Sequence, residues 1–140
     1  MTESWLDQSI LDSEIDVPGY VIERKNPNRH GGGVIMYIRD SITYTRRVDI
    51  SETSQLVENI WIEVKSLKSS INVKSLLLGC FYRPPSSNSD YFDGILDIIE
   101  KASLDDKEFV VHGDFNYDYQ FDESLCPNPL NYIENLYSMS

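Results

Sequence analysis

The sequence has few cysteines, few basic residues and no long apolar run, and each shortage excludes a class of protein. Its two cysteines, Cys80 and Cys126, are too few for a disulfide scaffold. We predict two reduced thiols in an intracellular protein, with a disulfide between them as the less favoured alternative. No stretch approaches the roughly 20 apolar residues of a membrane-spanning helix, and residues 1–5 lack the basic and apolar blocks of a signal peptide. We therefore expect no association with a membrane.

The shortage of basic residues bears on the kind of partner. Twelve lysines and arginines stand against 23 aspartates and glutamates, which gives a net charge of −11. Proteins that bind nucleic acids usually carry a basic face, and repulsion from a polyanion slows encounter and weakens binding. Taken alone, this balance argues against a DNA-binding module. It is less damaging for a nuclease that meets phosphate through a bound divalent cation.

The length and the overall composition indicate one domain. A chain of 140 residues with 41% hydrophobic and 25% charged residues resembles an ordinary globular domain with a single core. There is no internal repeat and no low-complexity segment. The oligomeric state cannot be read from these features.

Extended runs dominate the first two thirds of the chain. Alternating or continuous apolar residues predict strands at 20–23, 33–38, 43–48, 59–65 and 73–82. The first two flank a polar, glycine-rich loop at 26–32 and read as a hairpin. The run 76–82 is apolar on both faces, which is typical of a central strand covered on both sides.

Helical periodicity follows the strands. Its apolar stripe has i, i+3, i+4 and i+7 spacing and consists of Tyr91, Phe92, Ile95, Leu96, Ile98 and Ile99. Either Ser89 or Asp90 is a suitable N-cap. A short strand at 109–112 comes next, and a weaker helical stripe occupies 129–139. Many strands followed by helix, strand and helix predict a layered α/β or α+β domain.

Polar residues with chemical potential follow two of the apolar strands. Asp114 and Asn116 come directly after the strand at 109–112, where loops often shape a site over a rigid sheet. Aspartate and asparagine also cap ordinary turns, and from this tetrapeptide alone the turn is the favoured interpretation. Tyr82 ends the central strand, while Arg83 alternates to the opposite face in a structural or solvated position.

The other residues with possible chemical roles are Glu3 and the two histidines. Glu3, beside an aromatic residue, is either a metal ligand or one more exposed acid near a terminus. His112 lies next to Gly113, and we interpret it as a strand residue whose ring has hydrogen-bond partners. The other histidine, His30, falls in the hairpin loop.

Five segments in order resemble the endonuclease domain of non-LTR retrotransposons, a branch of the endonuclease/exonuclease/phosphatase superfamily. A single Gly-Asp-Phe-Asn is a weak signal, but the ordered series is a strong one. The segments are Thr2-Glu3-Ser4-Trp5-Leu6, Ile15-Asp16-Val17-Pro18-Gly19-Tyr20, Arg29-His30-Gly31-Gly32-Gly33-Val34-Ile35-Met36-Tyr37-Ile38-Arg39, Tyr82-Arg83-Pro84-Pro85-Ser86-Ser87 and Gly113-Asp114-Phe115-Asn116.

The resemblance implies a fold, a reaction and a set of roles. The fold is α+β, part of a DNase I-like four-layer α/β/β/α sandwich with its first strand and C-terminal strands missing, so residues 1–140 form a single partial domain. Glu3 would bind Mg²⁺ or Mn²⁺, and Asp114 would orient or deprotonate the attacking water. Asn116 would hydrogen-bond a phosphate oxygen, and Tyr82 would steady the developing charge. The implied substrate is DNA, which implies a nuclear location.

The sequence departs from the family's pattern at both ends. The family has an asparagine on a strand before the glutamate, and a later aspartate followed by Ser-Asp-His. Only two residues precede Glu3, and the 24 residues after Asn116 (140 − 116) contain no histidine. We therefore expect little or no nuclease activity from these 140 residues, because members of one catalytic unit fail together.

Two other functions compete with a DNA endonuclease. One is a phosphatase or phosphodiesterase of the same superfamily that acts on a small or lipid phosphate, which suits the acidic balance slightly better. The other is a non-catalytic, co-opted binding or structural domain. The glycine-rich hairpin and the Tyr-Arg-Pro-Pro segment favour the retrotransposon branch.

Overall fold

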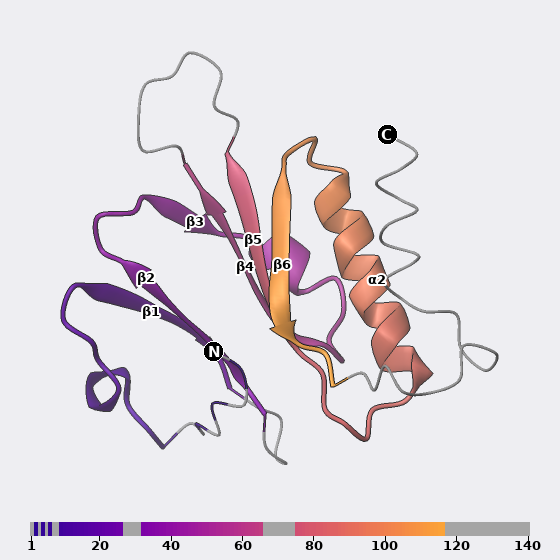
Figure 1. Ribbon diagram of the computed structural model, residues 1–140, viewed down its shortest axis with the longest axis horizontal. Helices are drawn as coiled ribbons and strands as arrows, with labels where there is room; N and C mark the ends of the chain where they lie inside the picture. The colour runs from indigo at the N-terminus through magenta and orange to yellow at the C-terminus, as the bar shows by residue number, and fades with distance from the viewer. Residues whose placement is uncertain are drawn as a thin grey trace.

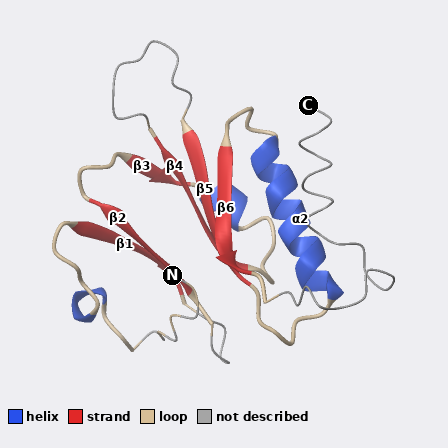
Figure 2. Ribbon diagram, viewed as in Figure 1, coloured by secondary structure: helices blue, strands red, loops and turns tan. Residues whose placement is uncertain are grey.

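The described part of the chain is a mixed α+β structure with two sheets and few helices (Figures 1 and 2). The computed structural model describes residues 9–26, 32–65 and 75–116, together with Thr2, Ser4 and Leu6. Cys126, Glu3, His30 and the predicted helix at 129–139 therefore lie outside the described residues. A short 3-10 helix, Asp12–Glu14, precedes the first strand.

The first sheet is a two-stranded antiparallel hairpin. Strand β1 (Tyr20–Lys25) pairs with β2 (Val34–Arg39), with Tyr20 opposite Arg39 and Lys25 opposite Val34. The predicted hairpin is thus confirmed, with β1 two residues longer than expected. Strand β2 is nearly all apolar and mostly buried, whereas β1 is only partly buried.

The second sheet has four strands in the order β3-β4-β5-β6. Their bounds are Tyr44–Arg46 (β3), Glu58–Val64 (β4), Leu76–Tyr82 (β5) and Phe109–Asp114 (β6). Neighbours are antiparallel except β5 and β6, which run parallel. A parallel pair needs a crossover connection, and helix α2 (Ser89–Ser103) provides it.

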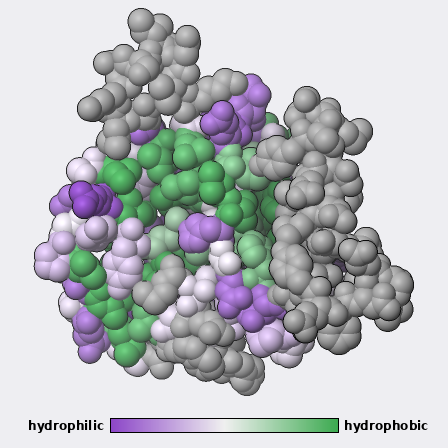
Figure 3. Space-filling model, in the orientation of Figure 1, coloured by the Kyte–Doolittle hydropathy of each residue, from purple (hydrophilic) through white to green (hydrophobic). Residues whose placement is uncertain are grey.

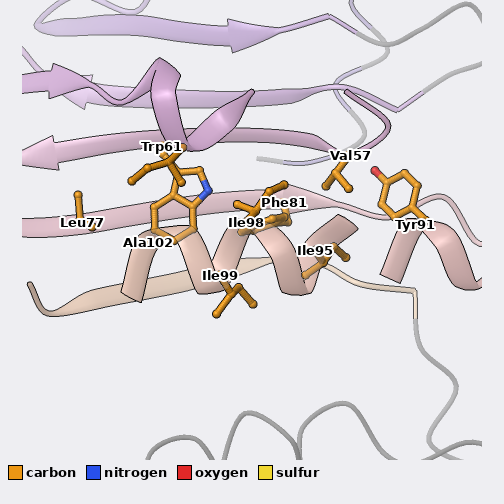
Figure 4. Packing of buried hydrophobic residues seen from close by; sticks show 10 residues of the cluster. Val57, Trp61, Leu77, Phe81, Tyr91, Ile95, Ile98, Ile99 and Ala102 are labelled. Atoms are coloured by element: carbon orange, nitrogen blue, oxygen red, sulfur yellow. The ribbon is translucent and has the colours of Figure 1, made fainter. Parts of the chain in front are cut away.

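The core occupies two layers on opposite faces of the four-stranded sheet. On one face β1 and β2 pack against β4 and β5, and the buried residues are Val34, Met36, Ile38, Ile60, Ile62, Cys80 and Tyr82. On the other face α2 and the short helix α1 (Val48–Ser51) cover the sheet around Trp61 and Phe81, whose rings meet edge to face at 5.8 Å (Figure 4). Strand β5 is therefore covered on both sides, as its uninterrupted apolar run predicted. Cys80 lies within it as a buried free thiol.

The predicted strand at 43–48 is wrong at its C-terminal end. Strand β3 stops at Arg46 and α1 begins at Val48. Between them Arg47 turns its guanidinium to three carboxylates, pairing with Asp49 at 2.7 Å, with Glu63 at 3.0 Å and with Asp105. Ion pairs that draw in a residue about 60 positions away override local strand propensity.

The start of α2 also differs from the prediction. The N-cap is Asn88, in extended conformation, so neither Ser89 nor Asp90 occupies that position. The side chain of Asn88 donates to the Asp90 carboxylate at 3.1 Å and caps no backbone N–H. Asn88, Ser89 and Asp90 are all good capping residues, so residue type alone does not decide where the helix begins. The preceding turn decides it, and the sequence does not define that turn. Strand β6 likewise extends two residues past its predicted end.

An ion-pair network closes the end of the sheet at which β5 and β6 begin. Lys107 lies 3.3 Å from Glu63 and 2.9 Å from Asp105, both of which also bind Arg47. The hydrogen bond from Arg47, aided by Lys107, holds the pKa of Asp105 well below its usual range. The network joins β4 to the α2–β6 connection, at the opposite end from Tyr82.

Among the helices in the described ranges, none combines the length and apolar character that crossing a bilayer requires.

Candidate functional site

Tyr82 and Asp114 lie side by side where the parallel strands β5 and β6 end. The register pairs Tyr82 with Asp114, and the ladder continues because the Arg83 N–H donates to the Asp114 carbonyl at 2.8 Å. Directly paired residues of parallel strands point to the same face. Phe109, Val111 and Phe115 pack on the helical side, so Asp114 shares the opposite face with Tyr82. The parallel pairing thus brings two sequence-predicted site residues together.

Asn116 folds back over the end of β5. Its backbone N–H donates to Asp114 Oδ1 at 2.9 Å, and its side-chain Nδ2 donates to the Arg83 carbonyl at 2.7 Å. Its φ of 42° is in the left-handed region, which asparagine tolerates better than most residues. The turn interpretation of Gly-Asp-Phe-Asn is therefore correct as geometry. These two hydrogen bonds do not involve the second N–H of the Asn116 side-chain amide, the Asn116 Oδ1 or the Asp114 Oδ2.

The close approach of β6 to β5 explains why residue 113, before Asp114, is a glycine. A Cβ built on it would lie 2.0 Å from the Phe81 carbonyl oxygen, and the φ of Gly113 is +153°. Strand β6 approaches β5 too closely there for any side chain, and Phe115 then stacks on Phe81 with ring centroids 6.1 Å apart. The motif thus fixes where β6 ends against β5.

Glu58 is a site residue that the sequence reasoning missed. It begins β4 directly opposite Tyr82, and it is a carboxylate with only 7% of its surface exposed. Its Oε2 accepts the Gly33 N–H at 2.7 Å. A Cβ on Gly32 would meet both Glu58 Oε2, at 2.7 Å, and the Tyr82 ring, at 2.6 Å. A charged residue at the start of an apolar strand and the glycine run were the available signals.

Tyr91, from the first turn of α2, supports the pair from behind. Its hydroxyl accepts the Glu58 N–H at 2.9 Å and donates to the Tyr82 carbonyl. Burial raises the pKa of Tyr91 to about 12, so this hydroxyl stays protonated and available as a donor. One side chain therefore satisfies a backbone donor on β4 and an acceptor on β5 at the position where Glu58 and Tyr82 lie.

Lys25 brings a cation to the same end of the molecule. Its Nζ lies 3.4 Å from the Val57 carbonyl, one residue before Glu58. Burial lowers the pKa of Lys25, while Glu52 and Glu58 act in the opposite direction. Lys25 thus lies beside the start of β4, at the end of the sheet where Glu58 is opposite Tyr82.

The structure leaves the assignment of Glu3 open, because that residue lies outside the described part of the chain. The residues on either side of it are placed beside β2. Thr2 forms an antiparallel bridge with Val34, and the Ser4 N–H approaches the Gly33 carbonyl at 3.5 Å. Gly33 is also the residue that holds Glu58.

The described residues contain no group of three or more His, Cys, Asp or Glu side chains that could hold a metal ion. His112 lies on β6 as predicted, but its side chain is exposed, and no hydrogen bond to its ring is found among the described residues. Burial of part of the ring lowers its pKa. The donors near Asp114 are carboxylate, amide and phenol oxygens, which suit a hard cation that keeps several water ligands.

Neither a protein-family model nor a curated protein matches the chain. Tyr82 and Asp114 are paired at the ends of two parallel strands, the Asn116 N–H binds the Asp114 carboxylate, and Glu58 lies opposite Tyr82 on β4. Such a set can orient a water molecule and donate hydrogen bonds to an anionic oxygen.

Proposed function

We propose that this chain carries a metal-dependent phosphodiesterase site of the endonuclease/exonuclease/phosphatase type, with DNA as its substrate. The observation that carries the proposal is the pairing of Tyr82 with Asp114, with Asn116 folded onto Arg83. The resemblance assigns roles to residues from two separate motifs, and those motifs meet at one edge of the sheet. A nuclear location follows only from the proposed DNA substrate.

The arrangement of layers is compatible with a DNase I-like sandwich. Two sheets lie face to face, and helices cover the outer face of the larger one (Figure 1). The proposed fold adds a further helical layer outside β1 and β2. The site then lies at one end of the two packed sheets, where loops that follow the strands can surround a phosphate.

The side chains have distinct tasks in the proposed reaction. Asp114 keeps Oδ1 on the Asn116 N–H and uses Oδ2 to orient or deprotonate the attacking water. The Asn116 amide, held by the Arg83 carbonyl, directs its second N–H to a phosphate oxygen. Tyr82 donates to the charge that develops at phosphorus. A divalent cation held by Glu3 would supply Lewis-acid stabilisation.

The acidic balance of the chain makes the cation central to the proposal. With a net charge of −11, the protein repels a polyanion at long range. Because a bound cation neutralises the carboxylates at the site, phosphate can approach there although the rest of the surface repels it. The same balance favours a second candidate substrate, a small phosphate ester, which carries fewer charges than DNA.

Metal binding is the direct test, because it does not depend on turnover by these 140 residues. Mn²⁺ is titrated into ¹⁵N-labelled protein, and we expect selective paramagnetic broadening of the amides of Tyr82 and 114–116. Glu3→Ala should abolish this broadening, because Glu3 is the proposed metal ligand, while Asp93→Asn, at an exposed position on α2, should leave it unchanged. Absent broadening, or equal broadening over all acidic surfaces, would show that the chain is a non-catalytic domain.

The substrate class is tested on the same labelled protein with Ca²⁺ in place of Mn²⁺. A short DNA duplex should displace the signals of Tyr82 and Asn116 at lower concentration than an inositol phosphate does. The opposite order would assign the site to small phosphate esters. A plasmid-nicking assay accompanies it, in which we expect little or no activity. Efficient nicking that is abolished by Glu3→Gln would contradict that expectation.

A further inference from the structure

Arg83 connects three segments at the edge of the candidate site. Its Nη1 donates to the carbonyls of Phe115 at 3.3 Å and Asn116 at 2.9 Å, and its Nη2 donates to the Ser87 carbonyl at 3.1 Å. Its backbone takes part as well, since its carbonyl accepts the Asn116 side chain and its N–H binds the Asp114 carbonyl. One residue thus joins β5, the loop 84–87 and the turn 114–116.

The contacts of the Arg83 guanidinium differ from those of Arg47. Arg47 binds carboxylates, whereas the side-chain hydrogen bonds found for Arg83 within the described residues all go to backbone carbonyls. Its Nε is buried without a hydrogen-bond partner there. The planar guanidinium holds its N–H donors in a fixed fork that reaches carbonyls on two loops at once, whereas a lysine ammonium is a compact charge on a flexible stem.

We propose that Arg83 is a positioning residue of the site, and that it holds Asn116 in the left-handed conformation beside Asp114. Asparagine tolerates the left-handed φ of Asn116 but does not require it, so contacts with neighbouring residues must select it. Arg83 does so from both sides, with Nη1 on the Asn116 carbonyl and its own carbonyl on Nδ2. The Asn116 N–H then reaches Asp114 Oδ1.

The consequence for chemistry rests on the proposed function. With Arg83 in place, the Asp114 carboxylate and the Asn116 amide keep one orientation relative to Tyr82. Without it, Asn116 relaxes to a right-handed or extended backbone, and its amide leaves the Arg83 carbonyl. A loss of alignment of about 1 Å is enough to weaken a preorganised site severely.

The test compares Arg83→Met with Arg47→Met by native-state hydrogen exchange. Arg47 provides the matched control, because its loss removes a cation and its ion pairs at the opposite end of the sheet. We expect Arg83→Met to raise the exchange rate of the Asn116 backbone N–H roughly tenfold or more, because charge-assisted bonds that close a local opening are lost. Arg47→Met should lower the unfolding midpoint and leave the Asn116 rate near wild type.

Two further readouts separate positioning from general stability. In Arg83→Met the Asn116 Nδ2 resonances should move toward solvent-exposed values, and Mn²⁺ broadening at Asp114 should require several-fold more metal. Arg83→Lys keeps the charge and at most one carbonyl contact, so it should show the same changes to a smaller degree. It also covers the case in which Arg83→Met fails to fold.

Four outcomes decide the matter. An Asn116 exchange rate in Arg83→Met equal to wild type overturns the proposal, as does an equal change in Arg47→Met. The proposal is supported if only the Arg83 variants show both faster exchange of the Asn116 N–H and a need for more Mn²⁺ to broaden the Asp114 signal. If the wild-type protein shows no Mn²⁺ response, the proposed function fails, while the exchange rates still decide whether Arg83 holds Asn116.

Discussion

A methyl group added at Gly32 should disturb the candidate site more than its position in a loop indicates. Gly32 is buried with a φ of +103°, and its missing Cβ would lie 2.6 Å from Tyr82 Cε1 and 2.7 Å from Glu58 Oε2. Neither neighbour can easily move away. The Tyr82 residue is 4% exposed, and the Gly33 N–H holds the Glu58 carboxylate. We therefore expect Gly32→Ala to lower the free energy of unfolding through both strain and overpacking.

Gly19 provides the control for the backbone part of this cost. Its φ is +84°, and a Cβ there would meet nothing within 4 Å. Gly19→Ala should therefore cost about 1–3 kcal/mol, the usual strain of a side chain at positive φ. Gly32→Ala carries that cost and adds about 1–3 kcal/mol for overpacking a buried contact. The difference between the two variants isolates the seating of the glycine loop on Tyr82 and Glu58.

Urea denaturation, followed by tryptophan fluorescence, measures both variants. Tyr82→Leu removes the nearer ring carbon, so a double-mutant cycle with Gly32→Ala should give a coupling energy of about 1 kcal/mol or more. The prediction is refuted if Gly32→Ala lowers the free energy of unfolding no more than Gly19→Ala does, or if the cycle shows no coupling. Either result would mean that the loop does not rest on these two side chains.

Two other perturbations follow from contacts at the two ends of the sheet. Tyr91→Phe leaves the buried Glu58 N–H and Tyr82 carbonyl without their shared partner, so urea titration should show a loss of about 1–3 kcal/mol; an unchanged midpoint would contradict this. The pKa of Asp105 is lowered in the folded state, chiefly by Arg47, so its contribution is present above roughly pH 4, the unfolded value, and is lost as the pH falls further. Asp105→Asn should flatten the fall in stability below about pH 4, and an unaltered slope there would refute the assignment.

The sequence predicted those parts of the fold in which local pattern and burial agree. The apolar run of β5 indicated a strand covered on both faces, and the helix of 91–99 showed its stripe plainly. The end of β3 was mispredicted because it depends on Arg47 reaching Asp105 across the sheet. No local pattern reports a contact between residues that far apart in the chain.

The candidate site was predictable only as a set of residue types. The motifs named Tyr82, Asp114 and Asn116, but their adjacency depends on the parallel register of β5 and β6. Glu58 was missed because its partner is set by cross-strand pairing. Strand alternation predicted that Arg83 lies on the opposite face, in a structural or solvated position. Alternation says nothing of the two loops that its guanidinium connects.

Strand β6 also has a consequence for how the protein behaves at high concentration. It is the last strand of its sheet among the described residues, Val110 on it is 49% exposed, and hydrophobic side chains gather at the middle of this face of the molecule (Figure 3). A strand that has no second partner among the described residues can pair with a second copy of the protein. The net charge of −11 keeps copies apart at low salt, but the screening length falls from about 10 Å at 0.1 M to about 3 Å at 1 M. Added salt should therefore favour self-association of this protein, because it screens the repulsion between copies.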